Sequence, residues 1–296
     1  MSEQPTAALP DRPDTIVVPI DGSSVAQAAL PVAHHLAAAL RAEVQRITVN
    51  DGGPGPSHPV EVELEGNATE AILAHVDALE APLVVLSAHG HSGWTKRLAG
   101  SVAERVIRRC AAPVVVVGPH LDRSLPLLAP RSLVVAVPPP PVPERLLPVT
   151  ADLARLLGAT VVLVHVVSPK LAAAAEQTGA DDPERTPDLE ALAAEVRAAG
   201  VARVEAKRVV SKHRTRSIIE VADELAPPVM IVAQAHAAEQ AKQSDQVTYK
   251  LLRHSRWPIL ATVGRPTPDP SDADDPDAPG EPGEPGEPGE PGEPDG

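Results

Sequence analysis

Short apolar runs alternate with amphipathic stretches along the first 265 residues of the chain. The first run, residues 16–20, is apolar at nearly every position, which is typical of a strand buried on both faces of a parallel sheet. Residues 24–40 then carry apolar side chains at helical spacing, which predicts an amphipathic helix. In the same half the pattern predicts further strands at 43–49, 60–64, 83–86 and 114–117, and helices at 69–79 and from Ser101 to just before Pro113. Strands that alternate with helices indicate a doubly wound α/β fold.

The pattern then repeats. Residues 15–50 match residues 132–167 without a gap, and 12 of these 36 positions are identical. Residues 84–117 match 229–262 at an offset of 145 instead of 117, with six of 34 positions identical. We therefore predict two doubly wound parallel five-stranded sheets in tandem, each in the strand order 3-2-1-4-5. The larger offset places 28 extra residues in the middle of the second copy, where we expect a polar loop and a helix at 187–199.

The first copy is abbreviated, because its loop at 51–59 is too short to hold the corresponding helix. We expect this departure to leave one face of its sheet thinly covered. The predicted organisation is a disordered N-terminus at 1–13, a first domain at 14–119, a linker at 120–129, a second domain at 130–264, and a disordered tail at 265–296.

Charge is concentrated in the tail. The chain has a formal net charge of −14, but residues 266–296 contain eleven Asp or Glu and no Lys or Arg. They also hold ten prolines, six glycines and no Val, Leu or Ile, so they cannot bury enough apolar surface to offset the entropy of ordering. Five Gly-Glu-Pro triplets at 280–294 have the collagen period, yet uniformly acidic triplets repel, so we expect an extended solubilising tail.

Composition excludes several classes of protein. One Tyr, two Trp and no Phe cannot supply stacking platforms for single-stranded nucleic acid, and the body has no basic excess for a phosphate backbone. No apolar run approaches the length of a membrane-spanning helix. The single cysteine, Cys110, excludes an intrachain disulfide, and the first residues lack the basic and apolar regions of a signal peptide. We therefore expect a cytoplasmic protein that contacts neither nucleic acid nor membrane.

The stretch after the fourth strand carries the candidate chemistry. It begins Ser87-Ala88-His89-Gly90, and after nine further residues Gly100-Ser101 open a helix. Ser101 and Glu104 have the spacing of a capping box. A helix N-terminus preceded by glycine presents free N–H groups and a positive dipole end, which suit an anion, and Lys96 and Arg97 add positive charge.

Asp21 follows the first strand and is expected to face this loop across the crevice where strand order reverses. A carboxylate there can accept hydrogen bonds from ribose hydroxyls while the loop holds phosphates. Neither G-x-x-x-x-G-K-[ST] nor G-x-G-x-x-G occurs in the chain.

The spacing Ser87-x2-Gly90-x9-Gly100-Ser101, together with Asp21, resembles the universal stress protein family, whose nucleotide-binding members carry G-x2-G-x9-G-[ST]. The resemblance covers about 14–119 and 130–264. It implies an ATP-type nucleotide, with Mg²⁺ accompanying it, and a role in a stress response. Ser87 in place of glycine is a departure, since a serine costs energy wherever the backbone needs positive φ. The residues implied to hold the nucleotide are Pro19, Ile20, Asp21, Val49, Leu86, Ser87, Gly90, Gly100, Ser101 and Val102.

The second copy has lost the motif. In the ungapped alignment Asp21 becomes Pro138, Gly90 becomes Ala235, Gly100 becomes Asp245 and Ser101 becomes Gln246. Its hydrophobic positions survive, which suggests a structural or pairing role. In the resembled family, domains pair through the last strand, so 114–117 and 258–263 are expected to pair within the chain or between two chains of a homodimer.

Other interpretations remain open. Ser101 can simply cap a helix, Gly90 can shape a loop, and His89 and His91 form no metal site without a third ligand nearby. No nucleophile–base pair or paired carboxylates emerge, so binding is expected rather than catalysis. The alternatives are an interaction scaffold that binds no nucleotide, or a slow ATPase or autophosphorylating protein that uses Ser101 or Ser87.

Overall fold

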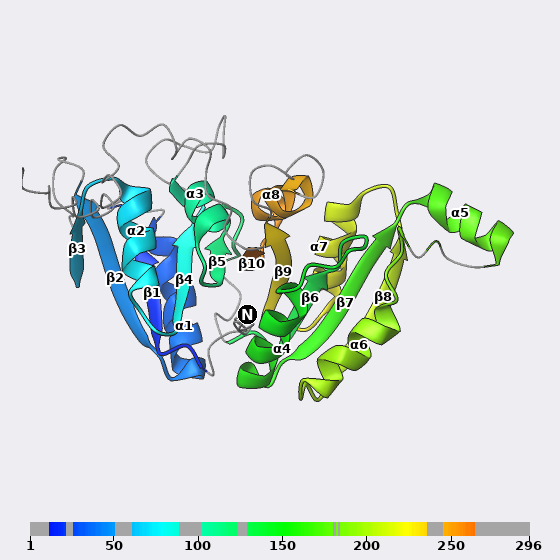
Figure 1. Cartoon of the computed structure of the whole chain (residues 1–296), viewed down its shortest axis with the longest axis horizontal. Helices are drawn as coiled ribbons and strands as arrows, with labels where there is room; N and C mark the ends of the chain where they lie inside the picture. The colour runs from blue at the N-terminus through cyan, green and yellow to red at the C-terminus, as the bar shows by residue number, and fades with distance from the viewer. Residues whose placement is uncertain are drawn as a thin grey trace, which may run out of the picture.

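The computed structural model describes residues 12–21, 26–50, 61–88, 102–122, 129–179, 182, 184–235 and 245–263. Its helices and strands divide into two successive groups of similar order (Figure 1). The first group is β1 Thr15–Pro19, η1 Ala26–Ala28, α1 Ala29–Leu40, β2 Glu43–Asn50, β3 Val62–Glu65, α2 Ala68–Asp77, β4 Pro82–Ser87, α3 Val102–Arg109 and β5 Val114–Val117. The second is β6 Ser132–Ala136, α4 Leu146–Leu157, β7 Thr160–Val167, α5 Pro169–Thr178, α6 Leu189–Ala198, β8 Val204–Val210, α7 Arg214–Glu224, β9 Val229–Ala235, α8 Asp245–His254 and β10 Ile259–Val263.

Each half confirms the predicted parallel sheet and its strand order. The described strands run β3-β2-β1-β4-β5 in the first half and β8-β7-β6-β9-β10 in the second, which is the order 3-2-1-4-5 twice. The two predicted five-stranded sheets are joined into one ten-stranded sheet, through the pairing within the chain that the last strands were expected to make. The two last strands join the halves, because β5 and β10 pair antiparallel with Val115 opposite Leu260.

Helices cover both faces of this sheet, and a hydrophobic core lies on each side. Helices α1, α4 and α6 contribute to one core and α2, α3, α7 and α8 to the other. Both cores continue across the junction of the halves. The central strands are apolar on both faces, as the uninterrupted apolar runs predict.

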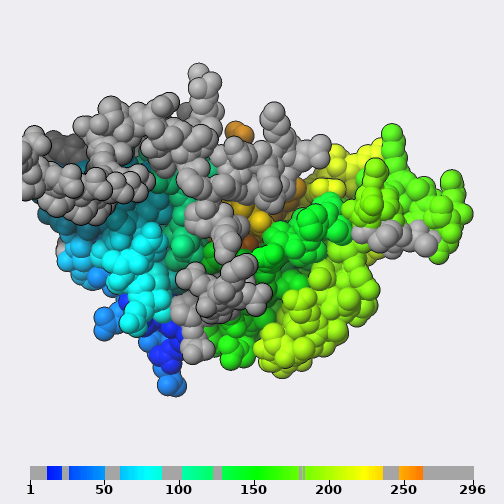
Figure 2. Space-filling model, viewed as in Figure 1, coloured from blue at the N-terminus to red at the C-terminus, as the bar shows by residue number. Residues whose placement is uncertain are grey.

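One helix is missing from the prediction. Where the sequence favours a polar loop, the structure has α5, which stands away from the sheet at one end of the molecule (Figures 1 and 2). The Ser168 side chain caps its first turn, Pro169 is its first residue, and Gly179 ends it with a φ of 73°. Only Ala172 of this helix is buried, so its sequence shows no apolar stripe. The sequence thus contains the residues that begin and end this helix, Ser168-Pro169 and Gly179, but lacks the apolar spacing that would predict a helix between them.

In the part of the chain that the structure describes, no helix is long and apolar enough to cross a membrane.

Candidate functional site

The carboxyl ends of β1 and β4 form the centre of the candidate site. β1 pairs in parallel with both β2 and β4, so the residues that follow β1 and β4 leave the sheet at the same edge. Pro19 is the last residue of β1, and Ile20 is buried and donates its N–H to the carbonyl of Ile47, 2.8 Å away. That bond fixes the chain just before Asp21, which is exposed at this edge.

β4 supplies the opposite wall. Leu86 and Ser87 are its last two residues and both are buried. The N–H of Ala88 then donates to the carbonyl of Val117, 3.0 Å away, which holds the exit of β4 against β5. The short Ser87 side chain leaves little bulk at the end of this strand.

The remaining predicted residues divide into two groups. Val49 is the penultimate residue of β2, pairs with Leu64 of β3 and is half-buried. Val102 is the first residue of α3 and is half-buried. The structure thus places described members of the predicted set at strand ends and at the start of α3. Gly90, Gly100 and Ser101, and with them Lys96 and Arg97, lie outside the described residues.

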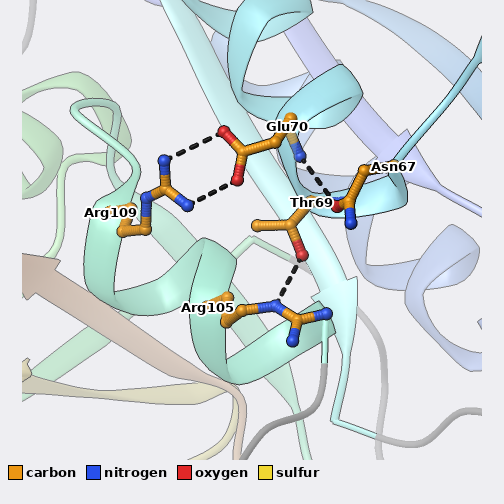
Figure 3. A network of polar contacts seen from close by, with 5 residues as sticks. All are labelled: Asn67, Thr69, Glu70, Arg105 and Arg109. Atoms are coloured by element: carbon orange, nitrogen blue, oxygen red, sulfur yellow. Dashed lines mark hydrogen bonds and ion pairs between the residues drawn. The ribbon is translucent and has the colours of Figure 1, made fainter. Parts of the chain in front are cut away.

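A polar network fastens α3 to α2 (Figure 3). The Nε of Arg105 donates to the hydroxyl of Thr69, 2.9 Å away, and Thr69 is fully buried. Arg109 reaches both carboxylate oxygens of Glu70, with the second bond at 2.9 Å. The Asn67 side chain caps α2 by accepting from the N–H groups of Thr69 and Glu70. Bidentate and charge-assisted bonds of this kind hold orientation as well as distance, so α2 fixes where α3 lies.

A second set of contacts fastens α3 to α8 in the other half. The Nε of Arg108 donates to the Tyr249 hydroxyl at 3.0 Å, and the guanidinium lies over the ring, 5.7 Å from its centroid. Glu104 forms an ion pair with Arg108 at 2.9 Å. The sequence pattern does not predict these contacts between helices. Two positions carried a readable signal: Asn67, because Asn-Ala-Thr-Glu at 67–70 has the form of a helix start, and Glu104, through its capping-box spacing from Ser101.

Strand register corrects the alignment of the two halves at this site. Val84 pairs with Val114, whereas Ile231 pairs with Ile259. The offset is therefore 147 at β4 and β9, but 145 at β5 and β10. The counterpart of Ser87 is Gln234, not the residue that an ungapped alignment selects, and Ala235 corresponds to Ala88 rather than to Gly90. Between the offsets of 147 and 145, the second half has two residues fewer than the first.

The second half keeps a hollow at the corresponding edge. A cavity of about 60 Å³ lies at the ends of β6, β7 and β9, beside α7 and α8. Pro138, the counterpart of Asp21, is among its lining residues. The loss of the nucleotide motif from the sequence therefore did not close the site. Among the described residues, no group of three or more His, Cys, Asp and Glu could hold a metal ion.

Two doubly wound α/β halves on one sheet, each with a candidate ligand site at its strand ends, define a tandem α/β protein. The profile of the universal stress protein family matches residues 53–118 and 130–262. The chain belongs to the universal stress protein family.

Known proteins agree with this assignment. A universal stress protein of Methanocaldococcus jannaschii is 30% identical over 136 residues, which is 34% of this chain and 80% of that protein. The crystal structure of a universal stress protein from Archaeoglobus fulgidus is similar, with a TM-score of 0.58 and 15% identity, covering 88% of this chain and 100% of that one. A protein of unknown function from Pseudomonas aeruginosa has a TM-score of 0.56 and 13% identity, covering 86% and 94%.

Proposed function

We propose that the first half, residues 14–119, binds a nucleotide of the ATP type and that the protein acts in a stress response through this binding. One observation carries the proposal. Asp21 and Ser87 leave neighbouring parallel strands at the point where strand order reverses, beside the start of α3. Ligands of doubly wound sheets bind in this crevice.

The residues at this edge fit the parts of a nucleotide. The exposed carboxylate of Asp21 can accept hydrogen bonds from ribose hydroxyls. Leu86 is proposed to line the site, and the backbone of Val49 is proposed to contact the base. Gly100, Ser101 and Val102 are proposed to hold phosphates through backbone N–H groups, and Mg²⁺ would accompany them.

The anchoring of α3 supports the proposal. Its last turn bonds to α2 through Arg109 and to α8 through Arg108, so the helix is held by packing and hydrogen bonds from two sides. A site built on an element that is already fixed loses less entropy when it binds. We propose a binding role rather than catalysis, because the residues proposed to hold the nucleotide supply hydrogen bonds and apolar contacts and include no nucleophile–base pair.

Calorimetric titration with ATP tests the proposal. Wild-type protein should bind, and Asp21→Asn should weaken binding by about tenfold, because a neutral amide is a poorer acceptor than a carboxylate. Asp152→Asn is the matched control, since Asp152 forms an ion pair with Arg155 on α4, in the other half of the chain. If millimolar ATP gives no heat of binding, the result contradicts nucleotide binding and favours an interaction scaffold that binds no nucleotide.

A second pair of variants tests the phosphate end. Gly100→Asp copies the residue that the second half has there and should abolish binding, because a carboxylate repels phosphate. Gly100→Ala adds a methyl group without charge and should bind more tightly than Gly100→Asp. Unchanged affinity in Gly100→Asp would place the nucleotide elsewhere.

A further inference from the structure

The cavity of the second half is the counterpart of the proposed nucleotide site, but its lining has a different chemistry. Ala136, Val137 and Pro138 line it at the positions that correspond to Pro19, Ile20 and Asp21. The acidic acceptor for a ribose is therefore gone. Whatever the cavity holds must be recognised by other groups.

Small side chains create the space. Ala233 lines the cavity at the register position of Leu86, and Ala136 stands in place of Pro19. Val164, Val166, Ile218 and Val247 make the rest of the wall mostly apolar. A volume of about 60 Å³ exceeds the ~10–15 Å³ that one water needs, so it admits the body of a small aliphatic molecule.

One residue of the cavity lining, Gln234, carries a buried acceptor that has no donor among the described residues. The side-chain oxygen Oε1 of Gln234 is buried and has no hydrogen-bond partner among the described residues. Gln234 is also the residue that replaces Ser87, at the end of the central strand β9. A buried amide oxygen left unpaired is destabilising, and a ligand N–H or O–H would supply the missing donor. The hydroxyl of Thr248 on α8 bonds to the backbone carbonyl of Gln234, which fixes the strand end.

A positive charge stands where the cavity meets solvent. Arg214 lines the cavity and is exposed, whereas α2 of the first half begins with Ala68. Arg214 is the first residue of α7, whose N-cap residue, His213, makes no side-chain cap bond. Guanidinium and helix N-terminus both favour a carboxylate at this place.

We propose that the second half binds a short aliphatic carboxylate that also carries a hydroxyl or amide donor. Its carbon chain occupies the apolar cavity, its donor bonds to Gln234 Oε1, and its carboxylate pairs with Arg214. ATP is not its ligand, because Pro138 has no side-chain acceptor for a ribose and the sequence of the second half has no counterpart of the Gly100-Ser101 pair. The proposal stands apart from nucleotide binding by the first half.

Methyl NMR of the full chain tests it with 3-hydroxybutyrate as the probe. This molecule should shift the methyl resonances of Ile218 and Val247 saturably, with millimolar affinity. Butyrate lacks the donor and 3-hydroxybutyramide lacks the charge. Each should bind about tenfold more weakly, the loss expected for one hydrogen bond to a buried acceptor or one charge-assisted bond. No shift with 3-hydroxybutyrate at about 50 mM would overturn the proposal, since even a ligand of this size should bind a complementary site by then.

Two variants locate the probe. Ala233→Leu restores the leucine of the first half and should abolish binding by filling the cavity. Arg214→Gln changes only an exposed side chain, so it should fold normally and weaken 3-hydroxybutyrate about tenfold while leaving 3-hydroxybutyramide unchanged. Arg216→Gln is the matched control, because Arg216 lies on the same helix and pairs with Glu220 outside the cavity.

The outcomes separate this site from the nucleotide site. Unchanged binding in both Ala233→Leu and Arg214→Gln would place the carboxylate elsewhere and overturn the proposal. ATP that displaces the probe from Ile218 and Val247 would also overturn it. Asp21→Asn should leave carboxylate binding intact, so loss of one activity leaves the other measurable.

Discussion

At the scale of single residues, the two halves use different side chains for the same hydrogen bond after corresponding helices. Cys110 follows α3 and Ser255 follows α8, and both are buried. The Ser255 hydroxyl accepts from the N–H of Trp257 at 2.9 Å, and the Cys110 thiol accepts from Ala112, two residues on in the same way. Burial raises the pKa of the Cys110 thiol to about 12, and the bond from Ala112 offsets only part of this. The thiol is therefore protonated and unreactive at neutral pH.

The raised pKa of Cys110 makes stability depend on pH at the alkaline end. In the unfolded chain the thiol has its ordinary pKa of 9.0, so above pH 9 the unfolded state releases a proton that the folded state retains. The contribution is complete below about pH 9 and is lost as pH rises toward 12. Urea unfolding of wild type should therefore show a steeper fall in the free energy of unfolding from pH 9 to 11 than Cys110→Ser.

Cys110→Ser is a fair control because Ser255 shows that serine fits this position. Equal slopes for the two proteins above pH 9 would contradict the predicted burial of the thiol. The predicted burial would also be contradicted if a thiol reagent at pH 8 labelled Cys110 in the native protein as fast as in the denatured chain.

At the scale of elements, corresponding helices of the halves begin differently. Asn67 caps α2 with two hydrogen bonds, whereas His213 at the start of α7 makes none with its side chain. The bonded cap belongs to the helix that holds α3 in place beside the proposed nucleotide site. The uncapped start belongs to the helix that contributes Arg214 to the cavity.

This difference gives a paired prediction for stability. Asn67→Ala should lower the free energy of unfolding by about 1 kcal/mol, because two N–H groups of α2 lose their acceptor. His213→Asn should raise it by up to about 1 kcal/mol by supplying a cap that α7 lacks. Thermal or urea unfolding measures both, and a loss of stability in His213→Asn would contradict the prediction.

The elements also show how far the sequence leads. The sequence pattern predicts every strand of the first half, 114–117 without error. Burial between two helix layers demands apolar runs in β1, β4 and β5, whereas β3 is an edge strand with alternating exposure. The α5 helix escapes because only Ala172 is buried, so no apolar stripe marks it. The equivalence of Gln234 and Ser87 is not visible in the sequence. The offset is 147 between β4 and β9 but 145 between β5 and β10, whereas an ungapped alignment applies one offset to both pairs. The cavity follows from that shift in register and from the small Ala233, which no local pattern reveals.

At the scale of the whole molecule, the two halves meet along a junction that we call the seam. It consists of the β5–β10 strand pair at its centre and the contacts of α3 with α8 beside it. Arg145 of the second half donates to the carbonyl of Ala111, 2.8 Å away. Gly118, just after β5, lies so close to α8 that a Cβ would stand 2.6 Å from the carbonyl oxygen of Leu252. Only glycine allows that approach.

Gly118→Ala should therefore destabilise the molecule as a whole. The added methyl group meets backbone, which cannot rotate away, and overpacking of this kind costs about 1–3 kcal/mol. Because both cores continue across the seam, calorimetry should show one unfolding transition that moves to lower temperature. Gly179→Ala is the control, because it ends the projecting α5 with open space around it and should cost only about 1 kcal/mol, for its positive φ. A wild-type Tm for Gly118→Ala would contradict the close approach.

Because β5 and β10 lie on one polypeptide, each half can change in sequence without the other, and the two halves occur in a fixed ratio. Two separate copies that pair through an edge must keep one self-complementary surface, so neither can change alone. Here the connection between β5 and β6 supplies the partner at a local concentration that dilution does not alter. Every molecule therefore contains one half of each kind in fixed proportion. Since it need not match itself, the second half can carry Pro138 where the first half has Asp21 and still keep its place in the sheet.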